Sequence, residues 1–427
     1  MGCENGCNKV KKYTEDTYCE LSNICGRCKE KESSFFSKSE AFCSQCFIIY
    51  IKRKFHKTLE SFFKEDISFK NNKALIAVSE GTSLALIKFF SENSDKFKFK
   101  RYFNILDFIH IEEDGSVKEV SNSSYISEKI NEMLPESLFF LINLKNYILN
   151  SDENIKLFWD KMSDALLGSQ ISKESVGSLN DLLSPLSSTT SRMDILKCIR
   201  NNIIYNFAEK NGYNVIIFGD TISSIASKII SETAKGRGYS IPWETRGKIK
   251  QHLYDIWLLR PMKDILRQEA YYFLEINGIQ NIKKFYHKAT TIDELVDRYF
   301  DDLEKNNPSF LFTVAKTSAK LQVPEIKDTK EYSNSEFCFI CQMPKENNVN
   351  DWLKKIALDK NDLSNVTNTE INENYENYLN RTKDVCYGCF IMLRGSKSEF
   401  ILPYFEKGNI NSIRNPKDEV LSEYLID

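Results

Sequence analysis

The amino-acid sequence predicts an α/β protein: a doubly wound parallel sheet flanked by N- and C-terminal zinc-knuckle or ribbon lobes. Two observations lead to this fold class. From Lys73 onward, short apolar runs of strand type alternate with helical patterns, as in parallel sheets whose strands are connected by helices. Eight of the twelve cysteines form Cys-x-x-Cys pairs near the two ends of the chain, a spacing typical of small metal-stabilised lobes.

The composition excludes several classes of protein. With 427 residues, 41% of them hydrophobic, the chain can bury a core without disulfide bonds. Its 58 basic and 60 acidic residues leave a formal charge of -2, so nucleic acid would have to bind at a local patch. No apolar run reaches the roughly 18 residues of a membrane span, and the N-terminus lacks a secretory apolar core. We therefore expect a soluble, intracellular protein with no membrane partner.

The first two cysteine pairs, Cys25-x-x-Cys28 and Cys43-x-x-Cys46, lie close together. Thiolates three positions apart on a tight turn can bind one tetrahedral ion, and two such turns complete a four-sulfur zinc site. Free thiols persist in reducing compartments, which predicts a cytoplasmic location. The other N-terminal cysteines are interpreted as free thiols of the tail: Cys3, Cys7 and Cys19.

A basic run follows the second pair and is expected to begin a helix. It contains four candidates for tRNA binding: Lys52, Arg53, Lys54 and Lys57. Such a run can clamp phosphates, but a solvated helix face explains the same pattern equally well. Residues 1–70 are predicted to form an N-terminal zinc-binding lobe that includes this basic helix.

The central domain is predicted over residues 71–290. Strands are expected at 74–78, 103–111, 138–142 and 215–218, and helices over about 191–211 and 221–235. A Ser-rich insertion near 144–190 ends in a predicted mobile loop at 184–191. Another helix is expected to begin at Pro261, because proline suits the first helical position, and to stop near Gly278.

The third predicted domain, residues 291–427, is charged and rich in asparagine. Its two Cys-x-x-Cys pairs are separated by a long polar stretch. They are predicted to form a second structural zinc site: Cys338, Cys341, Cys386 and Cys389. The alternative is a set of independent structural cysteines.

The turn after the first central strand resembles the pyrophosphate-binding loop of the adenine-nucleotide alpha-hydrolase (PP-loop) group of ATP-using enzymes. That loop usually reads Ser-Gly-Gly-x-Asp-Ser, and its backbone amides cradle the phosphates of ATP at a helix N-terminus. In this chain Glu80 replaces the first glycine, and its carboxylate would repel phosphate. The degenerate phosphate loop consists of Ser79, Glu80, Gly81, Thr82 and Ser83.

A second turn, from Gly219 to Ser224, is similar to the Gly-His-Asn-x-Asp-Asp turn of tRNA-thiolating members of this group, with serine at both acidic positions. The segment from Arg200 to Ala208 resembles the helix that follows a catalytic Cys-x-x-Cys in those enzymes. Its register places Met193 and Leu196 where the cysteines would lie. Cys198, two residues away, is interpreted as a core cysteine, with a reactive thiol as the alternative.

Together with the segments 234–243 and 260–264 and the terminal cysteine pairs, these turns resemble the cytoplasmic tRNA 2-thiolation protein 2 family. The resemblance implies a non-catalytic subunit, a pseudo-enzyme, of a complex that thiolates wobble uridine 34 of lysine, glutamine and glutamate tRNAs. It also implies a catalytic partner, cytoplasmic tRNA 2-thiolation protein 1, and sulfur from a thiocarboxylated ubiquitin-related modifier. ATP would be bound by the partner and is not expected on this chain.

Two further tRNA-binding candidates, Lys235 and Arg237, alternate with glycines that would allow close approach to a phosphate, although a helix C-cap turn also explains them. Two other functions stay open. One is a self-sufficient ATP-dependent tRNA sulfurtransferase in which Cys198 or a knuckle cysteine carries sulfur. The other is a zinc-stabilised protein scaffold. Whether an iron-sulfur cluster replaces zinc at the cysteines also stays open.

Overall fold

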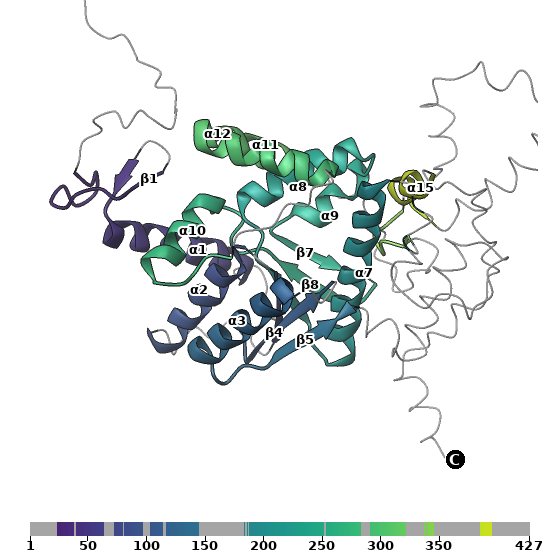
Figure 1. Ribbon diagram of the computed structural model, residues 1–427, viewed down its shortest axis with the longest axis horizontal. Coiled ribbons are helices and arrows are strands. Elements are labelled where there is room, and N and C mark those ends of the chain that lie inside the picture. The colour runs from purple at the N-terminus through teal and green to yellow at the C-terminus, as the bar shows by residue number, and fades with distance from the viewer. Residues whose placement is uncertain are drawn as a thin grey trace, which may run out of the picture. The chain divides into compact units, whose positions relative to one another are not determined.

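The structure is a computed structural model (Figure 1). It describes residues 24–37, 40–63, 72–79, 81–96, 103–113, 117–144, 183, 186, 188–251, 253–282, 291–321, 337–338, 340–345 and 385–394. The chain divides into two compact units, one of residues 1–145 and 195–324 and the other of residues 146–194 and 325–427. The first unit holds the sheet and the first two cysteine pairs, and the second holds the other two pairs. The three predicted domains stay a prediction.

The six-stranded sheet has the order β5-β4-β3-β6-β8-β7. Its strands are β3 (Lys73–Val78), β4 (Ile105–Glu112), β5 (Phe139–Asn143), β6 (Val215–Phe218), β7 (Lys248–Gln251) and β8 (Ile256–Leu259). All neighbouring pairs are parallel except β7 and β8, which are antiparallel. The predicted doubly wound parallel sheet is therefore confirmed, and the sequence missed its last two strands.

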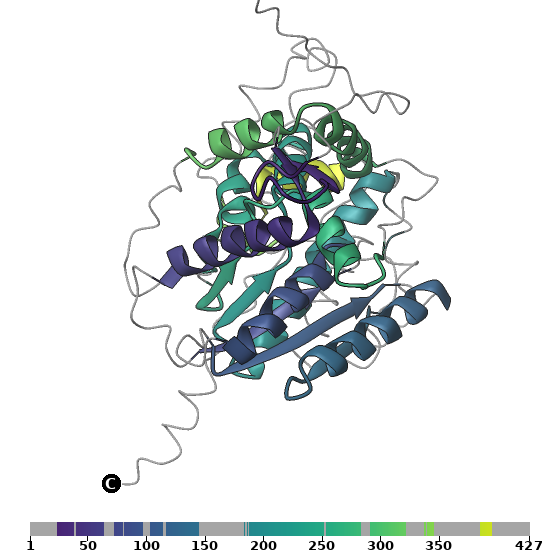
Figure 2. The same ribbon diagram turned by 90° about the vertical axis from the view of Figure 1, so that its left-hand side faces the viewer.

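Helices cover the sheet, and the apolar residues of its central strands explain why. The strand β3 is buried along nearly its whole length, which requires packing on both faces. One apolar core joins β3, β4 and β6 to α1 (Ser44–Phe63), α2 (Ser83–Lys96), α3 (Val117–Met133) and α10 (Arg267–Ile276). In Figures 1 and 2 these four helices gather beside the sheet.

Two helices that the sequence analysis did not predict, α11 (Ile292–Asn306) and α12 (Pro308–Ser318), pack on α8 (Ile222–Ala234). Phe300 and Leu311 are buried in this second cluster, together with Ile222 and Ala226 of α8. The start of α11 carries a complete capping box, in which Thr291 and Glu294 satisfy each other's backbone amides. Residues 291–321 therefore belong to the same unit as the sheet.

The predicted start of a helix at Pro261 was wrong. Residues 261–265 form turns, and α10 begins only at Arg267. The Glu269 carboxylate accepts a hydrogen bond from the Leu266 amide, which fixes the start of the helix. The predicted end is confirmed, since Asn277 caps the helix and Gly278 follows with a φ of 67°.

The long helix α7 (Thr189–Lys210) matches the predicted helix at about 191–211, and it includes the last residues of the stretch expected to be a loop. Most of the Ser-rich insertion, the N-terminal cysteines and Glu80 lie outside the described residues. Within the described residues, none of the helices combines the length and apolar content of a membrane span.

Candidate functional site

The first four-cysteine group lies on two turns that the chain brings together. Cys25 and Cys28 flank a turn closed by the Cys25 amide donating to Lys31 O, whereas Cys43 and Cys46 stand at the start of α1. The hairpin of β1 (Phe35–Ser37) and β2 (Glu40–Phe42) connects the two turns. The four Sγ atoms lie within 4.8 Å of one another, with 3.9 Å between Cys28 and Cys43. The spacing predicted from the sequence is therefore present in three dimensions.

Electrostatics favours a cation at this group. Burial raises the pKa of the Cys25 thiol, but backbone amides, with that of Cys28 first, outweigh burial and lower the pKa to about 6. Burial and the neighbouring thiols raise the pKa of Cys46 to about 12. One sulfur thus accepts negative charge readily while another resists it. A metal ion would remove this conflict, because its positive charge stabilises all four thiolates.

The second unit holds the other four-cysteine group: Cys338, Cys341, Cys386 and Cys389. Its Sγ atoms also lie within 4.8 Å of one another, and those of Cys341 and Cys386 are 3.7 Å apart. Cys389 lies in α15 (Tyr387–Arg394), and its amide donates to the Cys386 sulfur. A tetrahedral ion with metal–sulfur bonds of about 2.3 Å holds its sulfurs about 3.8 Å apart. Both groups have donors that fit one such ion.

The N-terminal cysteine lobe contacts the sheet domain through hydrogen bonds to Glu269. This fully buried carboxylate accepts hydrogen bonds from Ser37 at 2.6 Å and Tyr50 at 3.3 Å, and it pairs with Lys54 at 2.6 Å. The Tyr272 ring stacks on Phe35 with centroids 4.2 Å apart. Side chains of the cysteine lobe and of α1 therefore converge on α10 of the sheet domain.

The two loops that resemble nucleotide-binding turns meet at the carboxyl ends of β3 and β6, where ligands of doubly wound sheets bind. Here the loops contact each other. Thr82 donates to Gly219 O at 3.2 Å, and a Cβ at position 219 would lie 3.2 Å from the Ser83 hydroxyl. The Ser83 hydroxyl is buried and accepts a hydrogen bond from the Ser79 amide at 3.1 Å. A backbone donor that could face a phosphate is thus paired internally.

The tRNA-binding candidates on α1 separate into two kinds. Arg53 and Lys57 are exposed and lie one turn apart on the same face. Lys52 is partly exposed and pairs with Glu92 at 2.6 Å. Lys54, in contrast, is committed to the buried Glu269. The predicted basic face therefore consists of three side chains, and Lys54 joins the lobe to the domain.

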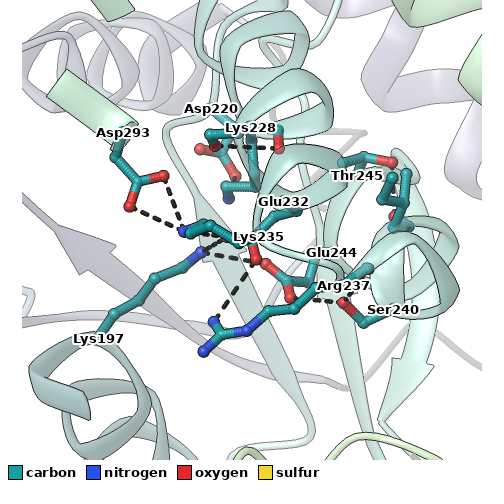
Figure 3. A network of polar contacts seen from close by, with 12 residues as sticks. Lys197, Asp220, Lys228, Glu232, Lys235, Arg237, Ser240, Glu244, Thr245 and Asp293 are labelled. Carbon is teal, nitrogen blue, oxygen red and sulfur yellow. Dashed lines mark hydrogen bonds and ion pairs between the residues drawn. The ribbon is translucent and has the colours of Figure 1, made fainter. Parts of the chain in front are cut away.

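Lys235 and Arg237 are both buried and face a carboxylate at the end of α8 (Figure 3). Glu232, which is fully buried, lies 3.1 Å from the Lys235 ammonium and 3.5 Å from the Arg237 guanidinium. Lys197 of α7 also pairs with it, and Asp293 of α11 pairs with Lys235 at 2.8 Å. Lys197 also lies 3.3 Å from Glu244 of α9 (Ile241–Thr245). Lys235 and Arg237 therefore both point toward the buried carboxylate of Glu232. Contact of Lys235 or Arg237 with tRNA stays a prediction.

The same network shifts the pKa of its acids and of Lys197. Burial raises the pKa of Glu232, but Lys197, Lys235 and Arg237 outweigh it and hold the pKa well below the ordinary range. Burial lowers the pKa of Lys197, and Glu232 and Glu244 raise it well above its usual value. Glu232 was not predicted from the sequence; the signal that could have identified it is its position three residues before the predicted basic residue Lys235.

Leu196 and Cys198 are buried on α7, and Met193 is partly buried. Among the described residues, Cys198 belongs to neither of the two four-cysteine groups. The helix thus carries no cysteine pair at the positions where the resemblance places a sulfur-handling one. A core role for Cys198 fits its burial.

Comparisons with known proteins agree with these features. A family model described as cytoplasmic tRNA 2-thiolation protein 2 matches residues 291–391. The protein of that name from Schizosaccharomyces pombe is 28% identical over 398 residues, covering 90% of this chain and 96% of the relative. The one from Phaeosphaeria nodorum is 29% identical over 348 residues, covering 76% and 85%.

A solved structure gives the fold independently. The chain is similar to the U34-tRNA thiolase NcsA from Methanococcus maripaludis with its [4Fe-4S] cluster, with a TM-score of 0.50 and 17% identity over 76% of this chain and 98% of that chain. At this identity the likeness concerns the fold alone. The sheet order and the loops at its switch point define an α/β protein with the fold of that thiolase, and the chain carries two four-cysteine groups.

Over most of its length the chain is similar to proteins of the cytoplasmic tRNA 2-thiolation protein 2 family. The resemblance predicted from the sequence is confirmed. The relatives' name places them in the cytoplasm, in agreement with the location predicted from the cysteine pattern.

Loss of one thiol should remove one metal site. We expect Cys25→Ser to bind about one metal ion fewer than the wild-type chain, because a four-sulfur site loses a ligand. Metal analysis by mass spectrometry of the purified proteins measures this. Cys198→Ser is the matched control and should keep the wild-type metal content; an equal loss in both variants would contradict the assignment.

The Glu232 network should contribute to stability in a pH-dependent way. We expect Glu232→Gln to lose about 3–5 kcal/mol of unfolding free energy at pH 7, because three cations then face each other around a neutral side chain. Since the pKa of Glu232 is lowered by folding, its contribution is fully present above its unfolded pKa of about 4.3 and is lost as the pH falls further.

Denaturant unfolding of both proteins between pH 7 and acid pH measures this effect, and the difference between them should shrink below about pH 4. The exposed Glu136→Gln serves as a control and should change stability little. A difference between wild type and Glu232→Gln that stays constant with pH would contradict the role of the charge.

Proposed function

We propose that this chain is the non-catalytic subunit of the cytoplasmic tRNA 2-thiolation complex. The observation that carries the proposal is its similarity, along nearly the whole length of both chains, to a protein named cytoplasmic tRNA 2-thiolation protein 2. The reaction it serves is 2-thiolation of wobble uridine 34 in lysine, glutamine and glutamate tRNAs. Sulfur comes from a thiocarboxylated ubiquitin-related modifier, and the catalytic partner is cytoplasmic tRNA 2-thiolation protein 1.

The state of the switch-point loops supports a non-catalytic role. An adenylating enzyme needs backbone donors that face the phosphates of ATP. In this chain the Ser79 amide donates to the Ser83 hydroxyl, and Gly219 lies so near Ser83 that an added Cβ would be 3.2 Å from that hydroxyl. Thiolation chemistry also needs a sulfur-bearing thiol near the nucleotide, and α7 has Leu196 and Met193 at the positions where the resemblance expects cysteines.

We further propose that both four-cysteine groups hold structural zinc. Sulfur separations of 3.9 Å and 3.7 Å suit ligands of one tetrahedral ion. An iron-sulfur cluster distributes its cysteines over several irons, which requires the sulfurs to stand farther apart. The ion would stabilise small lobes that bury little apolar surface by themselves.

The exposed face of α1 is the proposed tRNA contact. Arg53 and Lys57 project from one side of the helix, and Lys52 is close enough to solvent to exchange Glu92 for a phosphate. Their helix is held against the sheet domain by Lys54 and Glu269. A rigid helix would present these cations to the RNA backbone in a fixed geometry.

Reconstitution of thiolation tests the proposed role. We expect thiolated uridine 34 only when the purified chain, the catalytic partner, ATP, the sulfur donor and tRNA are combined. Mass spectrometry of digested tRNA detects the product. Cys198→Ser should be as active as wild type in the mixture. Turnover by this chain alone would instead support a self-sufficient sulfurtransferase, and full activity of the partner alone would leave only a scaffold role.

Charge reversal tests the RNA contact. We expect Arg53→Glu with Lys57→Glu to weaken tRNA binding by about tenfold or more at low salt, because two phosphate contacts are lost, and to reduce the salt dependence by about one unit of slope per contact. Fluorescence anisotropy with labelled tRNA at several salt concentrations measures both quantities.

The control for this experiment is Lys210→Glu, an equal kind of charge change at the exposed end of α7. It should leave the affinity nearly unchanged. Because Lys210→Glu reverses one charge and the α1 variant reverses two, a loss of binding free energy half as large as that of the α1 variant would mean that net charge, rather than the face of α1, determines binding.

A further inference from the structure

The Asp220 carboxylate is surrounded by hydrogen-bond donors that would also suit the oxygens of a phosphate. Asp220 lies two residues after the end of β6, at the switch point of the sheet. One carboxylate oxygen accepts from the Arg260 guanidinium at 2.9 Å and from the Lys228 ammonium at 3.4 Å. The other lies 3.5 Å from the Ser224 hydroxyl, which also donates to Thr221 O at 2.9 Å. A guanidinium, an ammonium and a hydroxyl are groups that proteins use to bind phosphate.

These donors are built into the fold. Arg260 is 4% exposed; its backbone amide donates to Gly247 O, and its Nη1 donates to Arg246 O. Its guanidinium also lies over the Phe218 ring, 5.4 Å from the centroid. Lys228 comes from α8, as Figure 3 shows, and its side chain is 23% exposed. The cluster is therefore rigid on its Arg260 side and open to solvent at its Lys228 side.

The charge of Asp220 is stabilised where it stands. Burial raises the pKa of its carboxyl group, but Lys228 and Arg260 outweigh burial and lower it. The position is informative in the sequence as well. In the turn that this segment resembles, a histidine stands at position 220 and acids at the positions of Ser223 and Ser224. This chain therefore has serines at the two acidic positions of that turn, 223 and 224, and an acidic residue at position 220, where the turn has histidine.

We propose that Asp220 is an internal substitute for a phosphate-bearing ligand, and that Arg260, Lys228 and Ser224 form an anion site that the chain fills with its own carboxylate. The ligand class of this site is inorganic pyrophosphate or the phosphate chain of a nucleotide. A bound nucleotide would bridge the loops after β3 and β6. In this chain the loops touch through Thr82 and Gly219, and the Asp220 carboxylate neutralises the cations beside them.

This inference rests on the proposed non-catalytic role and extends it, since it gives the physical reason why the switch point needs no nucleotide. Removing the carboxylate should expose the site. We expect Asp220→Ala to bind pyrophosphate at least about tenfold more tightly than the wild-type chain, because the two cations lose their internal partner. Calorimetric titration of the full-length proteins with pyrophosphate measures the change.

Three further variants make the experiment specific. Asp220→Asn removes the charge but keeps the volume, so we expect a smaller gain. Lys228→Met added to Asp220→Ala should cancel most of the gain, since one of the two cations is lost. Asp302→Ala, which removes an exposed acid of α11, should show no gain; a gain as large as that of Asp220→Ala would trace the effect to net charge and overturn the proposal.

Thermal unfolding provides a second measurement. Pyrophosphate should raise the Tm of Asp220→Ala and Asp220→Asn but not that of the wild-type chain, because only a ligand of the folded state stabilises it. If Asp220→Ala does not fold, the comparison of Asp220→Asn with the wild-type chain tests the proposal. Folded variants that gain no affinity would overturn the internal-anion assignment, as would tight pyrophosphate binding by the wild-type chain. These assays contain no tRNA and no partner. A negative result would therefore overturn the anion site without affecting the proposed role in thiolation, which the reconstitution experiment tests separately.

Discussion

The arrangement of the first unit depends on the buried carboxylate of Glu269. It is fully buried, and it accepts hydrogen bonds from the N-terminal cysteine lobe, from α1 and from the start of its own helix. An unpaired charge at this depth costs several kcal/mol, so Lys54 and Ser37 must stay in place. The cysteine lobe, the basic helix and the sheet domain are thereby held as one body, and the exposed cations of α1 acquire a defined position.

The same device recurs twice in this unit. Glu232 gathers Lys197, Lys235 and Arg237 at the end of α8, and Asp220 gathers Arg260 and Lys228 at the switch point. In each case cations that could bind an external anion are neutralised by an internal carboxylate. The chain is close to neutral as a whole, and these networks neutralise five buried or partly buried cations of the described residues.

The two four-cysteine groups solve a different problem. Each group has four thiols that fit one metal ion, and a bound ion would stabilise the turns that carry them. In the first unit Phe35 and Phe42 of the lobe then pack against Phe47 and Tyr272, which connects the metal-binding turns to the main core. The domain would in this way keep a rigid surface for the proposed contacts with RNA and with a catalytic partner.

The sequence by itself determined the cysteine groups, the parallel strands β3, β4, β5 and β6 and the family resemblance, because each is encoded by residues close together in the chain. Cys25 and Cys28 need only a tight turn to share an ion, and the apolar run that becomes β3 needs only its own composition to be recognised as a strand. The polar strand β7 lacked such a local signal, whereas α11 carries one, the capping box of Thr291 and Glu294, that the prediction did not use. The tertiary structure alone decided which cations face solvent. Lys54 meets its carboxylate 215 residues away, and Lys235 meets Asp293 58 residues away. Pairing over such separations depends on how the elements pack, so neighbouring residues give no sign of it.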